Sequence, residues 1–146
     1  MVYLATYVGR GSLANMMIRF WTRSNASHSE IKVGGSSFSS SIMDGGVRSK
    51  RINFDDENWE LLPLPWVRQS DVVQYFAQTK DIKYGWWDLI CRQFMHLPFS
   101  NGKGQFCSEW CATAIGLKSG REFSPDTLRS VCMDIVDILE KVNYGG

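Results

Sequence analysis

The chain has 146 residues, 44% of them hydrophobic, and its 16 basic residues nearly balance 15 acidic ones. This length suits one domain with a substantial core, which we expect to span residues 1–146. The balanced charge and the lack of a phosphate-binding glycine loop argue against a nucleic-acid partner, and the basic run at 48–51 is predicted to be a solvated strand edge. The apolar runs are too short for a membrane span and no secretion signal is present, so we expect a cytoplasmic protein.

The first half of the chain is predicted to form a β-sheet with one helix. Alternating apolar and polar residues indicate strands, and apolar residues at helical spacing after Ser12 indicate the helix. Turns at Gly34-Gly35 and Asp44-Gly45-Gly46 join three strands into a meander. In chain order, the predicted elements are a strand at 2–8, a helix at 13–21, a loop at 22–27, and strands at 28–33, 36–43 and 47–52.

The second half is mainly helical by the same criteria. One further strand is cut off by Pro63 and Pro65. The last helix opens with Ser124-Pro125-Asp126, a cap followed by proline at the first helical position. In chain order, the predicted elements are a strand at 59–64 and helices at 70–79, at 86–95, from 107 and from 125. Together they predict an α+β domain in which helices pack a small antiparallel sheet.

The segment around Cys107 predicts a nucleophilic thiol. The residues before it form a loop by composition, and the helix formers after it place Trp110, Cys111 and Ala114 on one face. A helix beginning at Cys107 directs unpaired backbone N–H groups and the positive end of its dipole at the sulfur, which favours the thiolate. The alternative is an ordinary buried cysteine, and a partner for the thiol distinguishes the two.

The other cysteines suit the core. Cys91 and Cys132 lie on apolar helix faces, and four cysteines without a Cys-x-x-Cys spacing do not indicate a disulfide framework. Cys107 and Cys111 share a helix face, as two zinc ligands would, but no other pair of histidines or cysteines has metal-ligand spacing. We therefore expect no metal and no cofactor.

A thiol nucleophile needs a base, and the chain has two histidines. His96 ends a predicted helix, where it suits the negative end of the dipole. His28 opens a strand on its polar face and is the better partner for Cys107. Asp44, beyond the serine-rich strand, either orients the His28 ring or only forms an Asx-turn. Besides the Cys107 backbone N–H, the candidates for oxyanion or substrate binding are Ser41, Tyr84, Gln105 and Glu109.

Four blocks of the sequence, in this order, resemble a known family. They are 27–31 (Ser-His-Ser-Glu-Ile), 39–48 (ending Asp-Gly-Gly-Val-Arg), Tyr84 with Trp86-Trp87-Asp88, and 106–109 (Phe-Cys-Ser-Glu). The chain resembles the circularly permuted NlpC-like, papain-fold cysteine hydrolases of the YiiX-like branch, some of them encoded by bacteriophages. In these proteins the histidine strand precedes the cysteine helix, as it does in this sequence.

The resemblance implies a permuted papain-like fold with Cys107 as nucleophile and His28 as base. Family members cleave amide bonds in peptides or peptidoglycan, whereas lecithin:retinol acyltransferase-like relatives move acyl groups between lipids. Our leading hypothesis is a cysteine peptidase or amidase that acts on a peptide or peptidoglycan substrate through a thioester acyl-enzyme. The alternatives are a thioesterase or lipid acyltransferase with the same dyad, and a catalytically silent phage interaction module. A phage origin would place the protein in the host cytoplasm or the virion.

Overall fold

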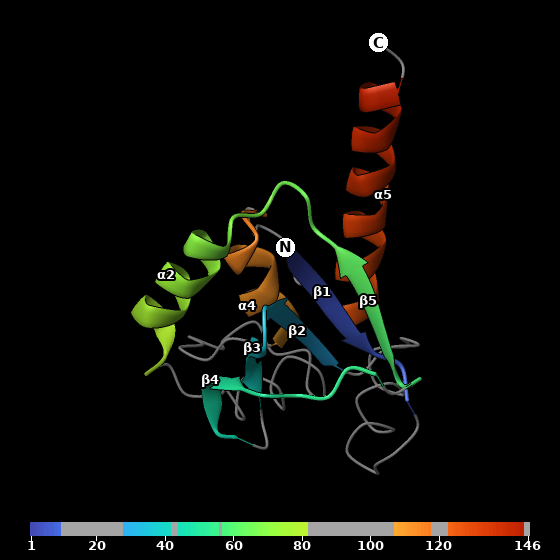
Figure 1. Ribbon diagram of the computed structural model, residues 1–146. Coiled ribbons are helices and arrows are strands. Elements are labelled where there is room, and N and C mark those ends of the chain that lie inside the picture. Colours follow the sequence, from blue (N-terminus) through green and yellow to red (C-terminus); the bar gives the residue numbers. More distant parts are fainter. Residues whose placement is uncertain (10–27, 42–43, 56, 82–106, 118–122, 145–146) are drawn as a thin grey trace, which may run out of the picture.

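Five antiparallel strands form one sheet in the order β4-β3-β2-β1-β5 (Figure 1). The computed structural model describes residues 1–9, 28–41, 44–55, 57–81, 107–117 and 123–144. Its strands are β1 (Val2–Tyr7), β2 (His28–Val33), β3 (Ser36–Ser41), β4 (Gly46–Lys50) and β5 (Trp59–Pro63). Its described helices are α2 (Gln69–Thr79), α4 (Cys107–Ala114) and α5 (Pro125–Tyr144). The predicted α+β class is confirmed.

The meander β2-β3-β4 forms as predicted. Gly34, in the β2–β3 turn, has φ 57°, a conformation that glycine adopts without strain. The strand predicted at 36–43 is described as far as Ser41, and its residues 42–43 lie outside the described residues. The strand predicted at 47–52 is too long, because β4 ends at Lys50. The helix predicted at 13–21, the loop at 22–27 and the helix at 86–95 lie outside the described residues.

The strand β5 does not continue the meander. It returns to the opposite edge of the sheet and pairs with β1, with Tyr3 opposite Pro63 and Tyr7 opposite Trp59. An edge strand accommodates Pro63 because only one of its sides must donate hydrogen bonds to the sheet. The other side of β1 pairs with β2, from Val2 opposite Val33 to Tyr7 opposite His28. His28 therefore lies at the start of a central strand.

The helices pack on the sheet around one buried tryptophan. The helix α4 contacts β2 and β3, while α5 contacts β1 and β5 (Figure 1). Trp110 of α4 is fully buried, and its indole N–H donates to Thr79 Oγ1 of α2 at 2.9 Å. Tyr75 lies beside it with ring centroids 5.4 Å apart. Burying this large side chain fixes the position of α4 over the sheet.

Polar contacts fix the N-terminal ends of α4 and α5. The Ser124 hydroxyl accepts a hydrogen bond from the Thr127 N–H at 3.1 Å, which confirms the predicted cap. The Ser108 hydroxyl, in the first turn of α4, donates to the Phe123 carbonyl and so ties the two helix starts together. Among the described helices, none has the length and apolar character needed to cross a bilayer.

Candidate active site

Cys107 is the first residue of α4, and its side chain meets His28 at the start of β2. A side-chain hydrogen bond joins the thiol to the His28 imidazole. The backbone groups of Ser29 and Ser108 also hydrogen-bond the sulfur. The thiol therefore lies at a helix start, beside an imidazole and two backbone donors, which are surroundings that stabilise negative charge on sulfur.

The pKa values of the two groups shift in opposite directions. Burial raises the pKa of the Cys107 thiol, but the positive charge and hydrogen bond of His28, with the backbone hydrogen bonds, outweigh burial and hold the pKa below its ordinary value. Burial alone lowers the pKa of His28, but the charges and hydrogen bonds of Cys107 and Glu30 raise it to about 10. Both shifts favour the form of the pair in which Cys107 is a thiolate and His28 an imidazolium.

The carboxylate that contacts the His28 ring belongs to Glu30. Its Oε1 lies 2.7 Å from His28 Nε2, which leaves Nδ1 as the ring nitrogen available to Cys107. His28 and Glu30 are two residues apart on β2, so their side chains leave the strand on the same side. The Glu30 side chain is fully buried, whereas that of His28 is 22% exposed. Glu30 is thus a shielded anion behind a partly accessible ring.

Arg48 of β4 keeps the buried Glu30 ionised. Its guanidinium binds the carboxylate through both terminal nitrogens, one of them 2.7 Å from Oε2. Burial opposes ionisation of Glu30, but the hydrogen bonds from Arg48 and His28 lower its pKa below the ordinary value. The sequence predicts that the basic run at 48–51 is solvated. This prediction is wrong for Arg48, whose side chain is only 15% exposed.

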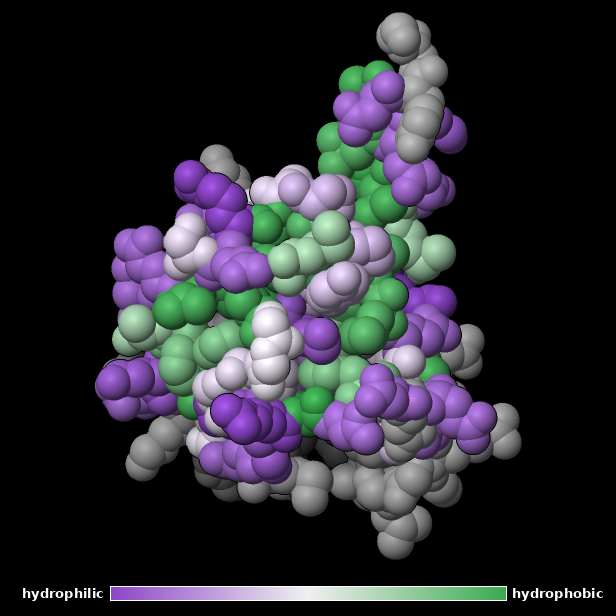
Figure 2. All heavy atoms as spheres, viewed as in Figure 1, coloured by the Kyte–Doolittle hydropathy of each residue, from purple (hydrophilic) through white to green (hydrophobic). Residues whose placement is uncertain are grey.

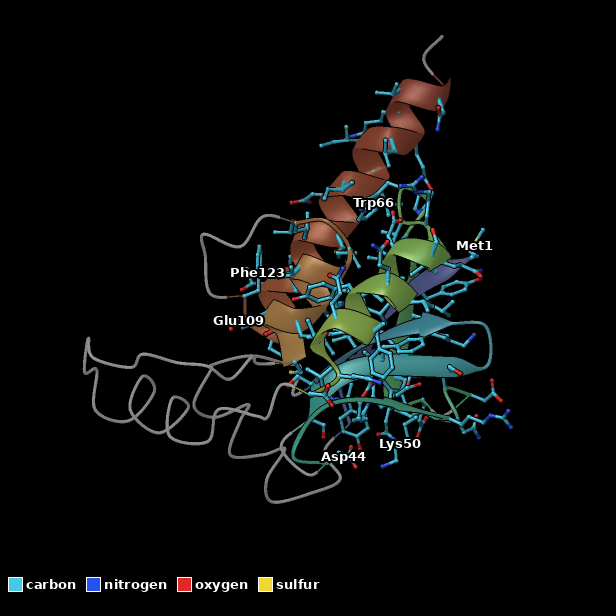
Figure 3. All side chains as sticks on the ribbon, turned by 90° about the vertical axis from the view of Figure 1, so that its left-hand side faces the viewer. Met1, Asp44, Lys50, Trp66, Glu109 and Phe123 are labelled. Carbon is cyan, nitrogen blue, oxygen red and sulfur yellow. The ribbon has the colours of Figure 1, made fainter. Side chains whose placement is uncertain are left out.

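Asp44 does not contact the His28 ring, the orienting role considered for it from the sequence; it binds Arg48 instead. Its carboxylate accepts hydrogen bonds from Arg48 Nε at 2.8 Å and from Lys50 Nζ at 3.3 Å, and Arg48 separates it from Glu30. Figure 3 shows Asp44 and Lys50 together at one edge of the sheet. The expected contact of Asp44 with His28 is therefore replaced by the Glu30 contact, because the β3–β4 turn holds Asp44 next to the side chains of its own hairpin.

The site is a row of alternating charges that begins at the sulfur. In order, the groups are the thiolate of Cys107, the imidazolium of His28, the carboxylate of Glu30, the guanidinium of Arg48, the carboxylate of Asp44 and the ammonium of Lys50. Each charge has a neighbour of opposite sign, so burial of Glu30 and Arg48 is compensated. Such a row stabilises the ion pair and orients the imidazole.

The remaining predicted site residues are Ser41, Glu109, Tyr84 and Gln105. Ser41 ends β3, buried and opposite Gly46, and no described contact links it to Cys107 or His28. Glu109 is partly exposed in the first turn of α4 (Figure 3). Tyr84 and Gln105 lie outside the described residues. Sequence reasoning missed Glu30 and Arg48; the His-x-Glu spacing on a strand is the signal that points to Glu30.

Cys111 lies one turn after Cys107 and differs from it in chemistry. It is fully buried, and its thiol donates to the Ser29 carbonyl at 3.5 Å. The Ser39 hydroxyl donates to the same carbonyl at 2.6 Å. Burial, with the nearby negative charges of Cys107 and Glu30, raises the pKa of Cys111. Cys111 is therefore a protonated anchor between α4 and β2, next to the histidine.

A cavity of about 510 Å³ lies at the other end of α4. Its walls come from α2, α5 and the C-terminal end of α4, and they include Trp66, Tyr75, Leu117 and Ile135. Its lining residue nearest to Cys107 in α4 is Thr113, six residues further along, so about 9 Å of helix separate the two. The chemistry of the thiol thus lies outside this cavity.

Within the described residues, no group of three or more histidines, cysteines and carboxylates is arranged to hold a metal ion. Comparison of the chain with protein-family models, with curated proteins and with solved structures gave no significant match. What the site does is therefore argued from its own residues.

Proposed function

We propose that this chain is a cysteine hydrolase that cleaves an amide or isopeptide bond of a peptide or peptidoglycan-type substrate. The observation that carries the proposal is the hydrogen-bonded pair of Cys107, at the start of α4, and His28, at the start of β2. The histidine strand precedes the cysteine helix in the chain and the helix packs on an antiparallel sheet. This arrangement supports the permuted papain-like fold that the sequence resembles.

In the first half of the reaction the Cys107 thiolate attacks the carbonyl carbon of the scissile bond. The carbonyl oxygen becomes an oxyanion, for which N–H groups of the first turn of α4 are suitable donors because they have no partner within the helix. As the carbon–nitrogen bond breaks, the His28 imidazolium gives its proton to the leaving amine. The products are a free amine and a thioester on Cys107.

In the second half, neutral His28 takes a proton from water, and the resulting hydroxide equivalent attacks the thioester carbonyl. The carbon–sulfur bond breaks, the acid product leaves, and the thiolate and imidazolium are restored. Glu30 holds Nε2 of the ring throughout, so that Nδ1 faces the sulfur, and its negative charge stabilises the imidazolium. Glu30, rather than Asp44, is the third member of the proposed triad.

The described structure favours this function over a catalytically silent interaction module. A silent interaction module requires no activated thiol, whereas the pKa of Cys107 is lowered despite burial.

The test is to incubate the protein with a fluorogenic peptide-amide library and with purified peptidoglycan fragments, and to follow both amide cleavage and the intact mass. We expect cleavage by the wild type and by Cys111→Ala, and none by Cys107→Ala or His28→Ala. A mass increase on Cys107 that hydroxylamine removes would identify the thioester. Acylation by lipid thioesters without cleavage of any amide would instead assign the site to acyl transfer.

A further inference from the structure

The helix α5 is anchored at its first turns only. Leu128 and Cys132 are fully buried against the body, but Ile138 is 59% exposed and Val142 is 69% exposed. Figure 1 shows the C-terminal half of α5 rising clear of the other described elements. About the last two turns of the helix thus carry apolar side chains into solvent.

These exposed residues belong to a regular stripe. Val131, Ile135, Ile138 and Val142 follow one another at intervals of four, three and four residues, the spacing of a helix-pairing seam. In Figure 2 the apolar side chains gather along one side of the projecting helix. We call these four residues the α5 stripe. A seam of this kind is stable in water when a second apolar surface covers it.

The charges beside the stripe are self-complementary. Asp134 and Lys141 are seven residues apart and flank the same edge of the stripe. If a second copy of α5 lies antiparallel against the first, with Ile135 opposite Ile138, then Asp134 of each copy faces Lys141 of the other. One register thus forms two identical ion pairs, whereas parallel pairing brings neither charge to a partner of opposite sign.

In the same antiparallel register, the C-terminal end of the second copy's α5 lies next to the cavity beside α4 of the first copy. This register places Val142 of the second copy opposite Val131, next to Ile135, which lines the cavity of about 510 Å³ together with Trp66 and Leu117. Three turns of paired helix alone bury too little for a stable dimer, which buries roughly 1,200–2,000 Å² in total. The cavity wall, which includes Trp66, Leu117 and Ile135, supplies further contact area for the end of the incoming helix.

The charge of the projecting part argues against a lipid occupant. Between 133 and 144 the helix carries Asp134, Asp137 and Glu140 against the single Lys141. Anionic membrane surfaces repel such a segment. We propose that two copies of this chain associate through antiparallel pairing of the α5 stripe, with the end of each helix covering the cavity of the other. This interface lies away from Cys107 and is independent of the proposed catalysis.

Sedimentation velocity over a wide range of protein concentration tests the interface with the full chain. We expect the wild type to form a dimer. Asp134→Lys replaces both attractive pairs by repulsive ones and should weaken the dimer by roughly tenfold. The double variant Asp134→Lys with Lys141→Asp restores both pairs and should restore the dimer. The matched control Glu140→Lys changes the same charge on the side of α5 opposite the stripe and should leave the dimer intact.

Ile138→Asp tests the apolar contact and should weaken the dimer by on the order of a hundredfold. Circular dichroism of each variant verifies that the fold is retained, which is expected because Asp134 and Ile138 are exposed. A wild type that stays monomeric at every concentration overturns the proposal. If that monomer also co-sediments with anionic vesicles, the α5 stripe binds lipid instead of a second copy. A dimer that tolerates Ile138→Asp, or that the double variant fails to restore, also overturns it.

Discussion

Glu30 Oε1 lies 2.7 Å from His28 Nε2, and the carboxylate is fully buried although the ring beside it is not. This contact fixes Nε2 of the imidazole, so that Nδ1 is available to hydrogen-bond the Cys107 thiol. It also gives the imidazolium a fixed counter-ion in a site from which water is largely excluded.

We predict that Glu30→Gln lowers kcat/KM by roughly tenfold to a hundredfold, because a charge-assisted hydrogen bond contributes about 1.5–3 kcal/mol. The matched control is Asp44→Asn, which removes a carboxylate that binds Arg48 and Lys50 instead of the ring. Its kcat/KM should change by no more than a few fold. The reverse order of the two effects would return the orienting role to Asp44.

Arg48 should be far more important for stability than an exposed arginine in an ion pair. Arg48→Met leaves the buried Glu30 without its counter-ion, and we expect the free energy of unfolding in urea to fall by about 3–5 kcal/mol. Arg68, whose side chain is 80% exposed, pairs with Asp71 at 3.0 Å. Arg68→Ala should cost less than about 1 kcal/mol. If Arg48→Met and Arg68→Ala lower the free energy of unfolding equally, the buried Glu30 carboxylate does not require Arg48 as its counter-ion.

The ion pair makes a defined contribution to stability as a function of pH. The raised pKa of His28 stabilises the fold fully below pH 6.5, and this stabilisation is lost as the pH rises toward about 10. The lowered pKa of Cys107 stabilises the fold above the ordinary thiol pKa of 9.0, and this stabilisation is lost as the pH falls through the folded-state pKa. Between 6.5 and 9.0 the contribution of His28 falls as the pH rises while that of Cys107 increases, so the two oppose each other.

Urea unfolding of the wild type and of the double variant His28→Gln with Cys107→Ala measures this contribution as the difference between their unfolding free energies. We expect that difference to fall as the pH rises from 9.0 to about 10, and to fall less steeply between 6.5 and 9.0, where the contribution of Cys107 opposes that of His28. A difference that declines just as steeply between 6.5 and 9.0 would indicate a neutral thiol beside an independently charged histidine.

Cys111→Ala should lower the stability of the protein without changing the reactivity of Cys107. Cys111 is buried and anchors α4 to the Ser29 carbonyl of β2, so its loss should lower the free energy of unfolding by about 1–2 kcal/mol. The rate at which Cys107 reacts with iodoacetamide should stay the same, as peptide mass spectrometry would measure. Loss of that reactivity in Cys111→Ala would make the anchor part of the site.

The elements that the sequence predicts well depend on local signals. Gly34 marks the β2–β3 turn, Ser124 caps α5, and the change from loop to helix formers predicts the start of α4 at Cys107. Each signal lies within a few residues of the feature that it predicts. The placement of β5 beside β1 could not be predicted in this way, because no local signal specifies which edge of the sheet a strand joins.

The partners of His28 required knowledge of the tertiary structure. Alternation along β2 places Glu30 on the same face of the strand as His28, and Arg48 is predicted to be solvated. Both are buried because β4 lies across β3 from β2 and brings the guanidinium to the carboxylate. Asp44 follows the strand next to β2, where an orienting group for His28 was expected, but Arg48 lies between Asp44 and the His28 ring.

The pair of Cys107 thiolate and His28 imidazolium is tested most directly by site-resolved alkylation with iodoacetamide as a function of pH. We predict that Cys107 reacts fast well below pH 9.0 in the wild type, and that this advantage disappears in His28→Ala, while Cys111 and Cys132 stay slow because burial raises their pKa values. If Cys107 reacts no faster than Cys132, or if its reactivity is the same in His28→Ala, the ion pair is absent and the proposed hydrolase is contradicted.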